Sequence, residues 1–143
     1  MKKIIKNIIE SQDDSNIALT SESSPPLLYK DLKSFVHKIA RQLAGNGILN
    51  KDRAAIVLPN GPFMASSFLT LSSYMSAAPL NPSYKTNEYE FYLKDLNPKI
   101  VIVEPNSSNE VVGVAKNLNI PVCEIKIKKD DPSGLFNLFN IES

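Results

Sequence analysis

Short apolar runs alternate along this chain with longer segments whose apolar residues recur at helical spacing, and this alternation limits the folds open to it. Residues 53–58 and 99–103 have the length and apolar content of strands that are buried on both faces. Residues 77–80 form a shorter run, in which Pro79 favours the edge of a sheet. Apolar and polar residues alternate in residues 122–127, as in a strand with one wetter face near a sheet edge.

Helical patterns precede and separate these runs. Apolar residues recur at three and four positions in residues 30–44, 86–96 and 107–118, and the first of these segments ends in two glycines, Gly45 and Gly47. Residues 63–75 carry no charge, which is typical of a helix buried on several sides. We expect Thr86 to cap one helix and Ser107, in a capping box with Glu110, to cap another.

This order of elements predicts an α/β fold with a mostly parallel, doubly wound sheet and helices on both faces. We expect three parts: an N-terminal amphipathic helix in residues 1–14, an α/β subdomain in residues 15–128, and a linker or truncated end in residues 129–143. Within residues 13–26 the sequence is rich in turn formers, and we expect a loop with a short strand at residues 17–19.

The first ten residues combine lysines with isoleucines at helical spacing. They suit a short helix that packs on the domain or, alternatively, a helix that lies on a membrane surface. They lack the apolar stretch and the small-residue cleavage site of a secretory signal, and no segment reaches the roughly 18 apolar residues that a membrane span needs. We therefore expect no membrane span and a cytoplasmic protein.

Charge and cysteine content exclude several classes of function. Sixteen basic and fifteen acidic residues give a formal net charge of +1, so no overall field attracts nucleic acid, and we expect no nucleic-acid partner. Tyrosines in residues 84–92 are interpreted as core packing of a helix face rather than as a surface for stacking bases. Cys123 is the only cysteine, which excludes an internal disulfide and a cysteine-clustered metal site.

No pair of residues in the sequence has the pattern of a nucleophile with its base, and we expect neither a catalytic nor a metal-binding residue. His37 falls on the polar flank of a helix, and Cys123 on the apolar face of a strand. The acidic pairs at residues 13–14 and 130–131 are interpreted as solvated turns.

Three motifs in order carry a resemblance to a known family. They are LYKDL at residues 28–32, DRAAIVLPNG at residues 52–61 and AAPLNP at residues 77–82. Their order and spacing resemble the opening segment of the adenylate-forming (AMP-binding) acyl-CoA synthetase superfamily. The stretch from residue 77 to residue 103 is similar in detail to the oxalate–CoA ligases, relatives of the 4-coumarate–CoA ligases.

The resemblance implies an N-terminal segment of an ATP-dependent carboxylic acid–CoA ligase, which joins an acid to AMP and then transfers the acyl group to CoA. The complete enzyme uses ATP, magnesium and CoA. The family binds the phosphates with a Ser/Thr/Gly-rich loop that ends in Pro-Lys, and we find no such loop in this sequence. We therefore expect this chain alone to be inactive and to bind none of these cofactors. The alternative is a stand-alone, non-catalytic α/β binding or interaction module.

The resemblance also implies one site and one kind of partner. Asn81, Pro82, Ser83 and Tyr84 match a loop near the pantetheine channel of related ligases, so they are candidates to border a CoA site. The alternative, which the sequence favours, is a rigid turn that joins strand to helix. The expected partner is the remainder of the parent enzyme or a second copy in a homodimer, which meets the uncharged helix of residues 63–75. Alternatively, residues 135–141 fold back over this helix.

Overall fold

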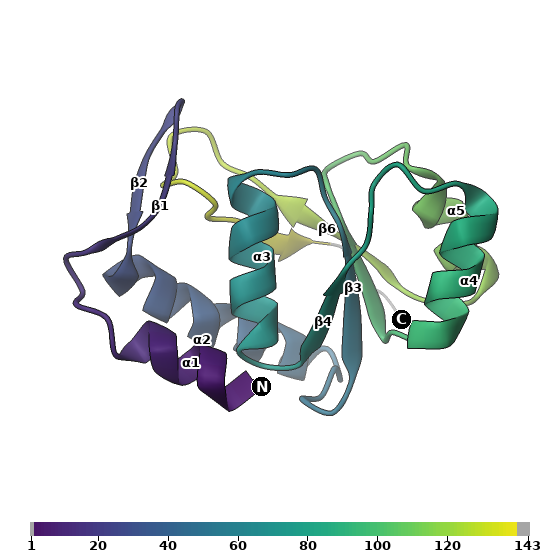
Figure 1. The fold of residues 1–143 in the computed structure, drawn as a ribbon, viewed down its shortest axis with the longest axis horizontal. Coiled ribbons are helices and arrows are strands. Elements are labelled where there is room, and N and C mark those ends of the chain that lie inside the picture. The colour runs from purple at the N-terminus through teal and green to yellow at the C-terminus, as the bar shows by residue number, and fades with distance from the viewer. Residues whose placement is uncertain (1, 140–143) are drawn as a thin grey trace.

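The computed structural model describes residues 2–139. Its elements, in chain order, are α1 (Lys2–Glu10), β1 (Ile17–Ser21), β2 (Ser24–Leu28), α2 (Tyr29–Gly45), β3 (Arg53–Val57), α3 (Pro62–Ser72), β4 (Ser76–Pro79), α4 (Thr86–Leu96), β5 (Ile100–Val103), α5 (Glu110–Asn117), β6 (Val122–Lys126) and β7 (Asn137–Phe139). Figure 1 shows the sheet between two groups of helices.

The main sheet has the strand order β4-β3-β5-β6-β7. Strands β4, β3, β5 and β6 run parallel, and β7 is antiparallel to β6. The chain leaves β3 for β4 on one side and then crosses back to β5 on the other side, so the strand order switches between β3 and β5. This confirms the mostly parallel, doubly wound α/β fold, with β4 at the predicted edge.

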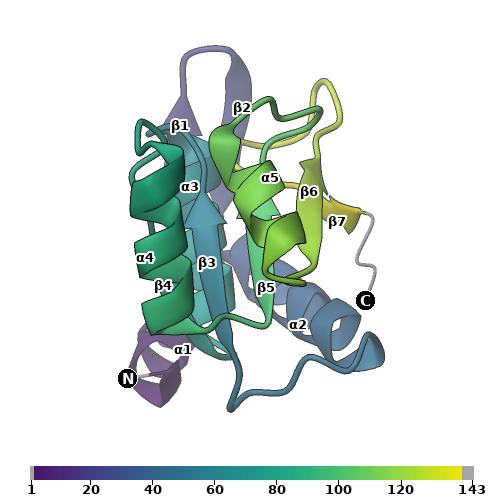
Figure 2. The same ribbon diagram turned by 90° about the vertical axis from the view of Figure 1, so that its right-hand side faces the viewer.

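Each face of the sheet has its own core. Ala54 and Ile56 of β3 pack in the cluster beneath α1, α2 and α3, whereas Ala55 and Val57 pack with α4 and α5. These four side chains are buried, as the apolar run predicted. Figure 2 views the face covered by α4 and α5, with α2 on the far side of the sheet.

Helix α1 packs against α2 and α3. Its Ile9 is buried and Ile5 is half-buried against the same core, whereas Ile4 and Ile8 are exposed. Over residues 2–139, no helix is long and apolar enough to cross a membrane.

The prediction that α3 exposes an apolar face is wrong. Its large apolar side chains are buried or half-buried, because α1, α2, β1 and β4 all contact the helix. Two of its small hydroxyls bond to backbone: Ser66 Oγ donates to the carbonyl of Gly134 over 2.7 Å, and Thr70 Oγ1 donates to that of Ser66 over 2.8 Å. Helix α3 is therefore largely covered, with Phe63, Met64, Phe68 and Leu69 half-buried, and pairing of a second copy through this helix stays a prediction.

The segment from residue 129 onward contains more structure than the linker that we expected. Strand β7 extends the sheet, and Phe136 is buried with its ring edge-on to Phe35, at 4.8 Å between ring centroids. Leu135 packs on the same core. Residues 135–139 thus fold back onto β6 and α2, and Gly134 contacts α3. The alternative that residues 135–141 cover α3 stays a prediction, and residues 140 and 141 lie outside the described part. The outer limits of the three expected parts stay a prediction.

Strand β2 was not predicted, because Pro25 and Pro26 indicate a turn. The strand nevertheless pairs with β1 in a separate hairpin. The carbonyl of Pro25 accepts hydrogen bonds from the backbone N–H of Ser133, over 2.8 Å, and from its Oγ, over 2.9 Å. Proline residues fit here because a two-stranded hairpin needs fewer backbone donors than a central strand. The hairpin therefore anchors residues 133–139, the segment that returns to the sheet and forms β7.

Helix caps and one helix face also differ from expectation. Residue Lys85, not Thr86, is the N-cap of α4, and its backbone N–H donates to Glu88 Oε1 over 3.0 Å. Asn109, not Ser107, caps α5, since its Oδ1 accepts from the N–H of Val111 over 2.8 Å.

The predicted apolar stripe of α4 is only partly buried. Tyr89 and Leu93 are fully buried, Leu96 is half-buried, and Tyr92 is 38% exposed. The stripe therefore centres on Tyr89 and Leu93, and Tyr92 lies at its margin.

Alanine substitutions at two glycines test the anchoring of the returning segment. Gly134 and Gly47 have similar left-handed φ angles of +80° and +77°, but a Cβ on Gly134 would lie 2.9 Å from the carbonyl oxygen of Pro62, whereas one on Gly47 meets nothing within 4 Å. We expect Gly47→Ala to cost about 1–2 kcal/mol for the backbone conformation alone. For Gly134→Ala we expect about 1–3 kcal/mol more from overpacking. Equal urea midpoints for the two variants would contradict this packing.

A second pair of variants tests the face of α4. We expect Leu93→Ala to reduce the free energy of unfolding by about 2–5 kcal/mol, because it empties a buried position. Tyr92→Ala should cost far less, since its side chain is partly in solvent. Denaturant unfolding measures both, and a larger loss for Tyr92→Ala would show that the buried face is wrongly assigned.

Candidate functional site

The switch in strand order defines where a doubly wound sheet binds ligands, in the crevice outside the carboxyl ends of the two strands that flank it. Here those strands are β3 and β5. A small cavity of about 140 Å³ lies at this place. Its lining comes from the segments that follow β3 and β5 and from the end of β6 (Leu58, Pro59, Asn60, Gly61, Pro62, Phe63, Glu104, Pro105, Ile125, Ile127).

The chemistry of this cavity does not fit a nucleotide triphosphate. Glu104 is the one ionisable group among its lining residues, and a carboxylate repels phosphate. Binding a triphosphate needs cationic side chains or a loop of converging backbone N–H groups. The described residues around the switch point therefore offer a small, mainly apolar crevice, and we derive no step of ATP chemistry from them.

The predicted CoA-border residues form a tight turn after β4. Asn81 Oδ1 accepts from the N–H of Ser83 over 2.8 Å, and the Asn81 carbonyl accepts from Tyr89 Oη over 2.8 Å. The carbonyl of Pro82 accepts from Asn109 Nδ2 over 2.8 Å. Asn81, Pro82 and Ser83 are exposed, and Tyr84 is half-buried. These bonds support the rigid-turn interpretation, and the CoA role of the four residues stays a prediction.

Tyrosine rings line the same turn. Tyr84 stacks on Tyr92 at 5.0 Å between centroids with an interplanar angle of 11°, and it meets Tyr89 edge-on at 5.7 Å. The adjacent Tyr92 hydroxyl is the main cause that raises the pKa of Tyr84. Burial raises the pKa of Tyr89 above its ordinary value. Both raised pKa values extend the neutral form of these phenols to higher pH, and the neutral Tyr89 hydroxyl donates to the Asn81 carbonyl.

Asn109, which the sequence interpretation missed, and Glu110, which it assigned to a capping box with Ser107, connect this turn to α5. Asn109 both caps α5 and holds the Pro82 carbonyl. Glu110 Oε1 accepts from Thr86 Oγ1 over 2.8 Å, and its other carboxylate oxygen lies 4.0 Å from Lys85 Nζ. The preference of asparagine for N-cap positions was the available signal for Asn109, but the contact with Pro82 joins residues far apart in sequence and could not be inferred.

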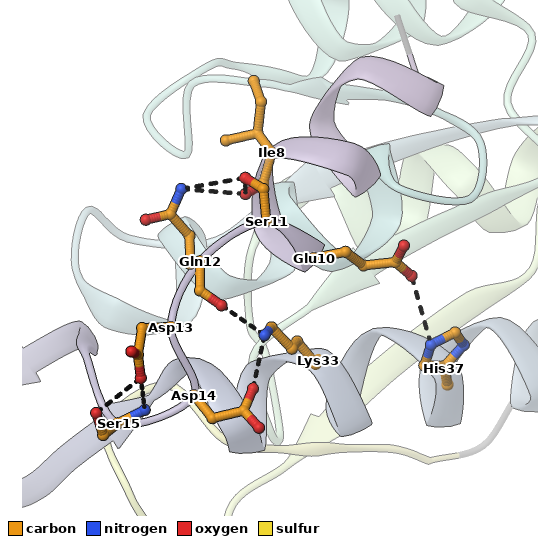
Figure 3. Close-up of polar contacts among 9 residues, drawn as sticks. All are labelled: Ile8, Glu10, Ser11, Gln12, Asp13, Asp14, Ser15, Lys33 and His37. Carbon is orange, nitrogen blue, oxygen red and sulfur yellow. Dashed lines mark hydrogen bonds and ion pairs between the residues drawn. The ribbon is translucent and has the colours of Figure 1, made fainter.

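The acidic pair at residues 13–14 takes part in structural hydrogen bonds. Figure 3 shows Lys33 Nζ donating to the Gln12 carbonyl and to Asp14 Oδ1, each over 2.6 Å. Asp13 Oδ1 accepts from the N–H of Ser15 over 2.9 Å, and this hydrogen bond is the main cause that lowers the pKa of Asp13. The acidic pair thus bonds to separate neighbours and shares no ligand position.

His37 and Cys123 agree with their expected roles. His37 is exposed, with its Nε2 3.7 Å from Glu10 Oε1, and the Cys123 thiol is buried in the core. In the part of the chain that the structure describes, no group of three or more His, Cys, Asp or Glu side chains is placed to hold a metal ion.

A larger groove of about 660 Å³ lies beside α5, over β5 and β6. Its lining mixes apolar and polar residues (Val103, Asn106, Ser107, Val112, Lys116, Asn119, Ile120, Pro121, Val122, Glu124). Glu124 Oε1 accepts from the backbone N–H of Asn106, so this carboxylate is engaged in closing the loop after β5. The groove shares no lining residue with the crevice at the switch point, and its lining brings together no catalytic constellation.

Comparison with known proteins identifies the family to which this chain belongs. The profile of the family described as AMP-binding enzyme matches residues 11–138. The chain belongs to this family, as the three sequence motifs predicted.

Individual relatives include ligases and peptide synthases. A probable CoA ligase of Humulus lupulus is 33% identical over 95 residues, which cover 66% of this chain and 18% of the relative. An oxalate–CoA ligase of Saccharomyces cerevisiae is 27% identical over 127 residues, which cover 80% of this chain and 23% of the relative. A dimodular nonribosomal peptide synthase of Bacillus subtilis is 29% identical over 74% of this chain and 4% of the relative. The chain spans less than a quarter of the length of each.

Solved structures share the fold. Apo MatB from Rhodopseudomonas palustris superposes with a TM-score of 0.72 over 97% of this chain and 30% of its own, at 18% identity. A benzoate CoA ligase from Burkholderia xenovorans gives a TM-score of 0.72 over 93% of this chain and 27% of its own, at 13% identity. At these identities the likeness establishes the fold alone.

The buried phenol of Tyr89 makes a pH-dependent contribution to stability that can be measured. Because its pKa is raised in the folded state, this contribution is present below the ordinary value of 10.0 and is lost as pH rises through the folded-state pKa. We expect Tyr89→Phe to lose about 1 kcal/mol at neutral pH from the missing hydrogen bond. Above pH 10.0 its stability should then fall less steeply than that of the parent chain. Urea unfolding across this range measures both curves, and parallel curves contradict the expected titration.

Proposed function

We propose that this chain is the N-terminal segment of an ATP-dependent carboxylic acid–CoA ligase and that it acts there as a scaffold. In this proposal the complete enzyme first joins an acid to AMP and then transfers the acyl group to CoA. The two motif-bearing strands β3 and β4 and the turn after them form one edge of its N-terminal domain. The chemistry belongs to parts of the enzyme that this chain does not contain.

The observation that carries the proposal is the contrast between the family and the crevice. The family match extends over residues 11–138, yet the crevice at the switch point is lined mainly by apolar residues, with Asn60 and the carboxylate of Glu104 among them. The short share of each relative that the chain spans supports the same view. ATP, magnesium and CoA are accordingly proposed as cofactors of the longer protein, with none bound by this chain alone.

Two finer proposals accompany it. Asn81, Pro82, Ser83 and Tyr84 are proposed to border the CoA channel; the exposure of the first three supports this, because a channel wall must be reachable from solvent. The buried Cys123 suits a reducing compartment, and we propose the cytoplasm. We also propose that the chain pairs with the remainder of the enzyme or with a second copy.

The proposal predicts that the purified chain releases no pyrophosphate above the blank when it is incubated with ATP, magnesium and small acids that include oxalate. The reason is that no cationic group lines the crevice. A full-length oxalate–CoA ligase assayed in parallel serves as the positive control. Pyrophosphate release by the chain alone would falsify the scaffold role.

The coding sequence after Ser143 separates this proposal from a stand-alone module. A frame that continues into a Ser/Thr/Gly-rich loop ending in Pro-Lys supports the ligase. A stop codon directly after Ser143 supports the non-catalytic module, whatever the enzymatic assay gives.

A further inference from the structure

The sequence contains two Asn-Gly pairs, and the structure gives them different surroundings. They are Asn46–Gly47, directly after α2, and Asn60–Gly61, between β3 and α3. An asparagine before glycine is prone to chemical modification, because glycine has no side chain to keep its backbone nitrogen away from the asparagine amide. All four residues are exposed, so access to water does not distinguish the two pairs.

Asn46 is held in the turn that closes α2. Its Nδ2 donates to the carbonyl of Gln42 over 2.7 Å. The backbone N–H of Gly47 donates to the carbonyl of Ala44 over 3.1 Å. The side-chain amide of Asn46 and the nitrogen of Gly47, which would have to meet for the pair to react, are therefore each fixed by a hydrogen bond.

Asn60 and Gly61 lack these restraints. Within residues 2–139, neither the Asn60 side-chain amide nor the Gly61 N–H makes a hydrogen bond, and no side chain caps α3. Gly61 has a φ of +147°, which glycine adopts readily, and a Cβ built on it would meet nothing within 4 Å. The space around the pair is open, so the Asn60 side chain can turn toward the Gly61 nitrogen.

We propose that Asn60 is a site of spontaneous deamidation in the folded chain, whereas Asn46 is protected. The nitrogen of Gly61 gives its proton to solvent and attacks the amide carbon of Asn60 to form a succinimide ring. The bond from Cγ to Nδ2 breaks, and ammonia leaves with a proton from solvent. Water then opens the ring at either carbonyl, which gives aspartate or isoaspartate. Water is consumed and ammonia released, so the reaction needs no other reagent.

The adjacent helix ends favour this difference between the pairs. Gly61 is the N-cap of α3, and its carbonyl accepts a hydrogen bond from the N–H of Ala65 over 3.1 Å. The partial positive charge of a helix N-terminus stabilises the deprotonated Gly61 nitrogen and the carboxylate of the product. Asn46 lies instead at the C-terminus of α2, where the partial charge is negative. The carboxylate of Glu104 opposes the effect at Asn60, but it is exposed and screened by solvent.

Deamidation at Asn60 would change the crevice at the switch point. Asn60 and Gly61 both line this crevice, in which Glu104 is the one ionisable lining residue. A new carboxylate at residue 60 adds a second negative charge and makes the crevice more repulsive to phosphate. The isoaspartate product also inserts a methylene group into the main chain between β3 and α3. The inference rests on the two turns and holds whether or not the ligase proposal is correct.

Peptide mass spectrometry of the aged chain tests the assignment. The folded chain is incubated in warm, mildly alkaline buffer and digested with trypsin, which separates the two pairs because Lys51 and Arg53 lie between them. We expect the mass gain of an amide-to-acid conversion to accumulate at least about tenfold faster at Asn60, since two hydrogen bonds must break before Asn46 can react. Asn60→Gln is the matched control and should abolish the gain at this residue, because its longer side chain forms the corresponding ring far more slowly.

A parallel incubation in concentrated guanidinium chloride separates the effect of the fold from that of the local sequence. In the unfolded chain, Asn46 should react at nearly the same rate as Asn60. Equal rates in the folded chain, a faster reaction at Asn46, or an Asn60 that reacts only in denaturant overturns the proposal. A difference between the pairs that persists unchanged in denaturant also overturns it, because the turn of α2 would then protect nothing.

Discussion

Strand β3 has neither a free face nor a free edge. Its backbone pairs with β4 on one side and with β5 on the other, and its buried residues contribute to both cores. The small side chains of Ala54 and Ala55 let helices approach the centre of the sheet from both sides. The helices and the candidate site are positioned around this strand. Helix α3 packs on one face of the sheet and α4 on the other, and the strand order switches between β3 and β5.

The second constraint is that residues 133–136, near the end of the described chain, cover part of the core under α2 and α3. Ser133 bonds to Pro25, Gly134 bonds to Ser66, and Phe136 contacts Phe35. These three contacts join the hairpin, α3 and α2 to a single returning segment. They also account for Ser66 in α3, because its small side chain allows the backbone of Gly134 to approach closely.

Much of the fold could be predicted from local patterns. The strands β3, β4, β5 and β6 and the helices between them follow from apolar periodicity, which a parallel sheet with two covered faces enforces. Elements that depend on distant partners could not be predicted. Strand β7 exists because β6 offers an edge, and β2 forms despite Pro25 and Pro26 because β1 lies beside it. Tyr92 satisfies the helical period, yet stacking on Tyr84 holds it at the surface.

The position of the candidate site was predictable from the sequence. The contacts that its polar groups make were not. Pro59, Asn60 and Glu104 directly follow the strands expected at residues 53–58 and 99–103, and the topology brings these three residues to one crevice. The polar groups around Asn81 are occupied by contacts with Asn109 and Tyr89, which no local pattern reveals. The family relationship therefore rests on the profile match over residues 11–138, while the mainly apolar lining of the crevice is the observation behind the proposed scaffold role.

A titration followed by two-dimensional NMR tests the central claim, that the sheet built on β3 is a scaffold which binds no nucleotide by itself. Mg·ATP, and separately CoA, would be added to the labelled chain while the amide signals of Asn60, Glu104 and Ser83 are observed. The account predicts that Mg·ATP produces no saturable shift at Asn60 or Glu104. A saturable shift of these two signals at millimolar or lower Mg·ATP would contradict the account.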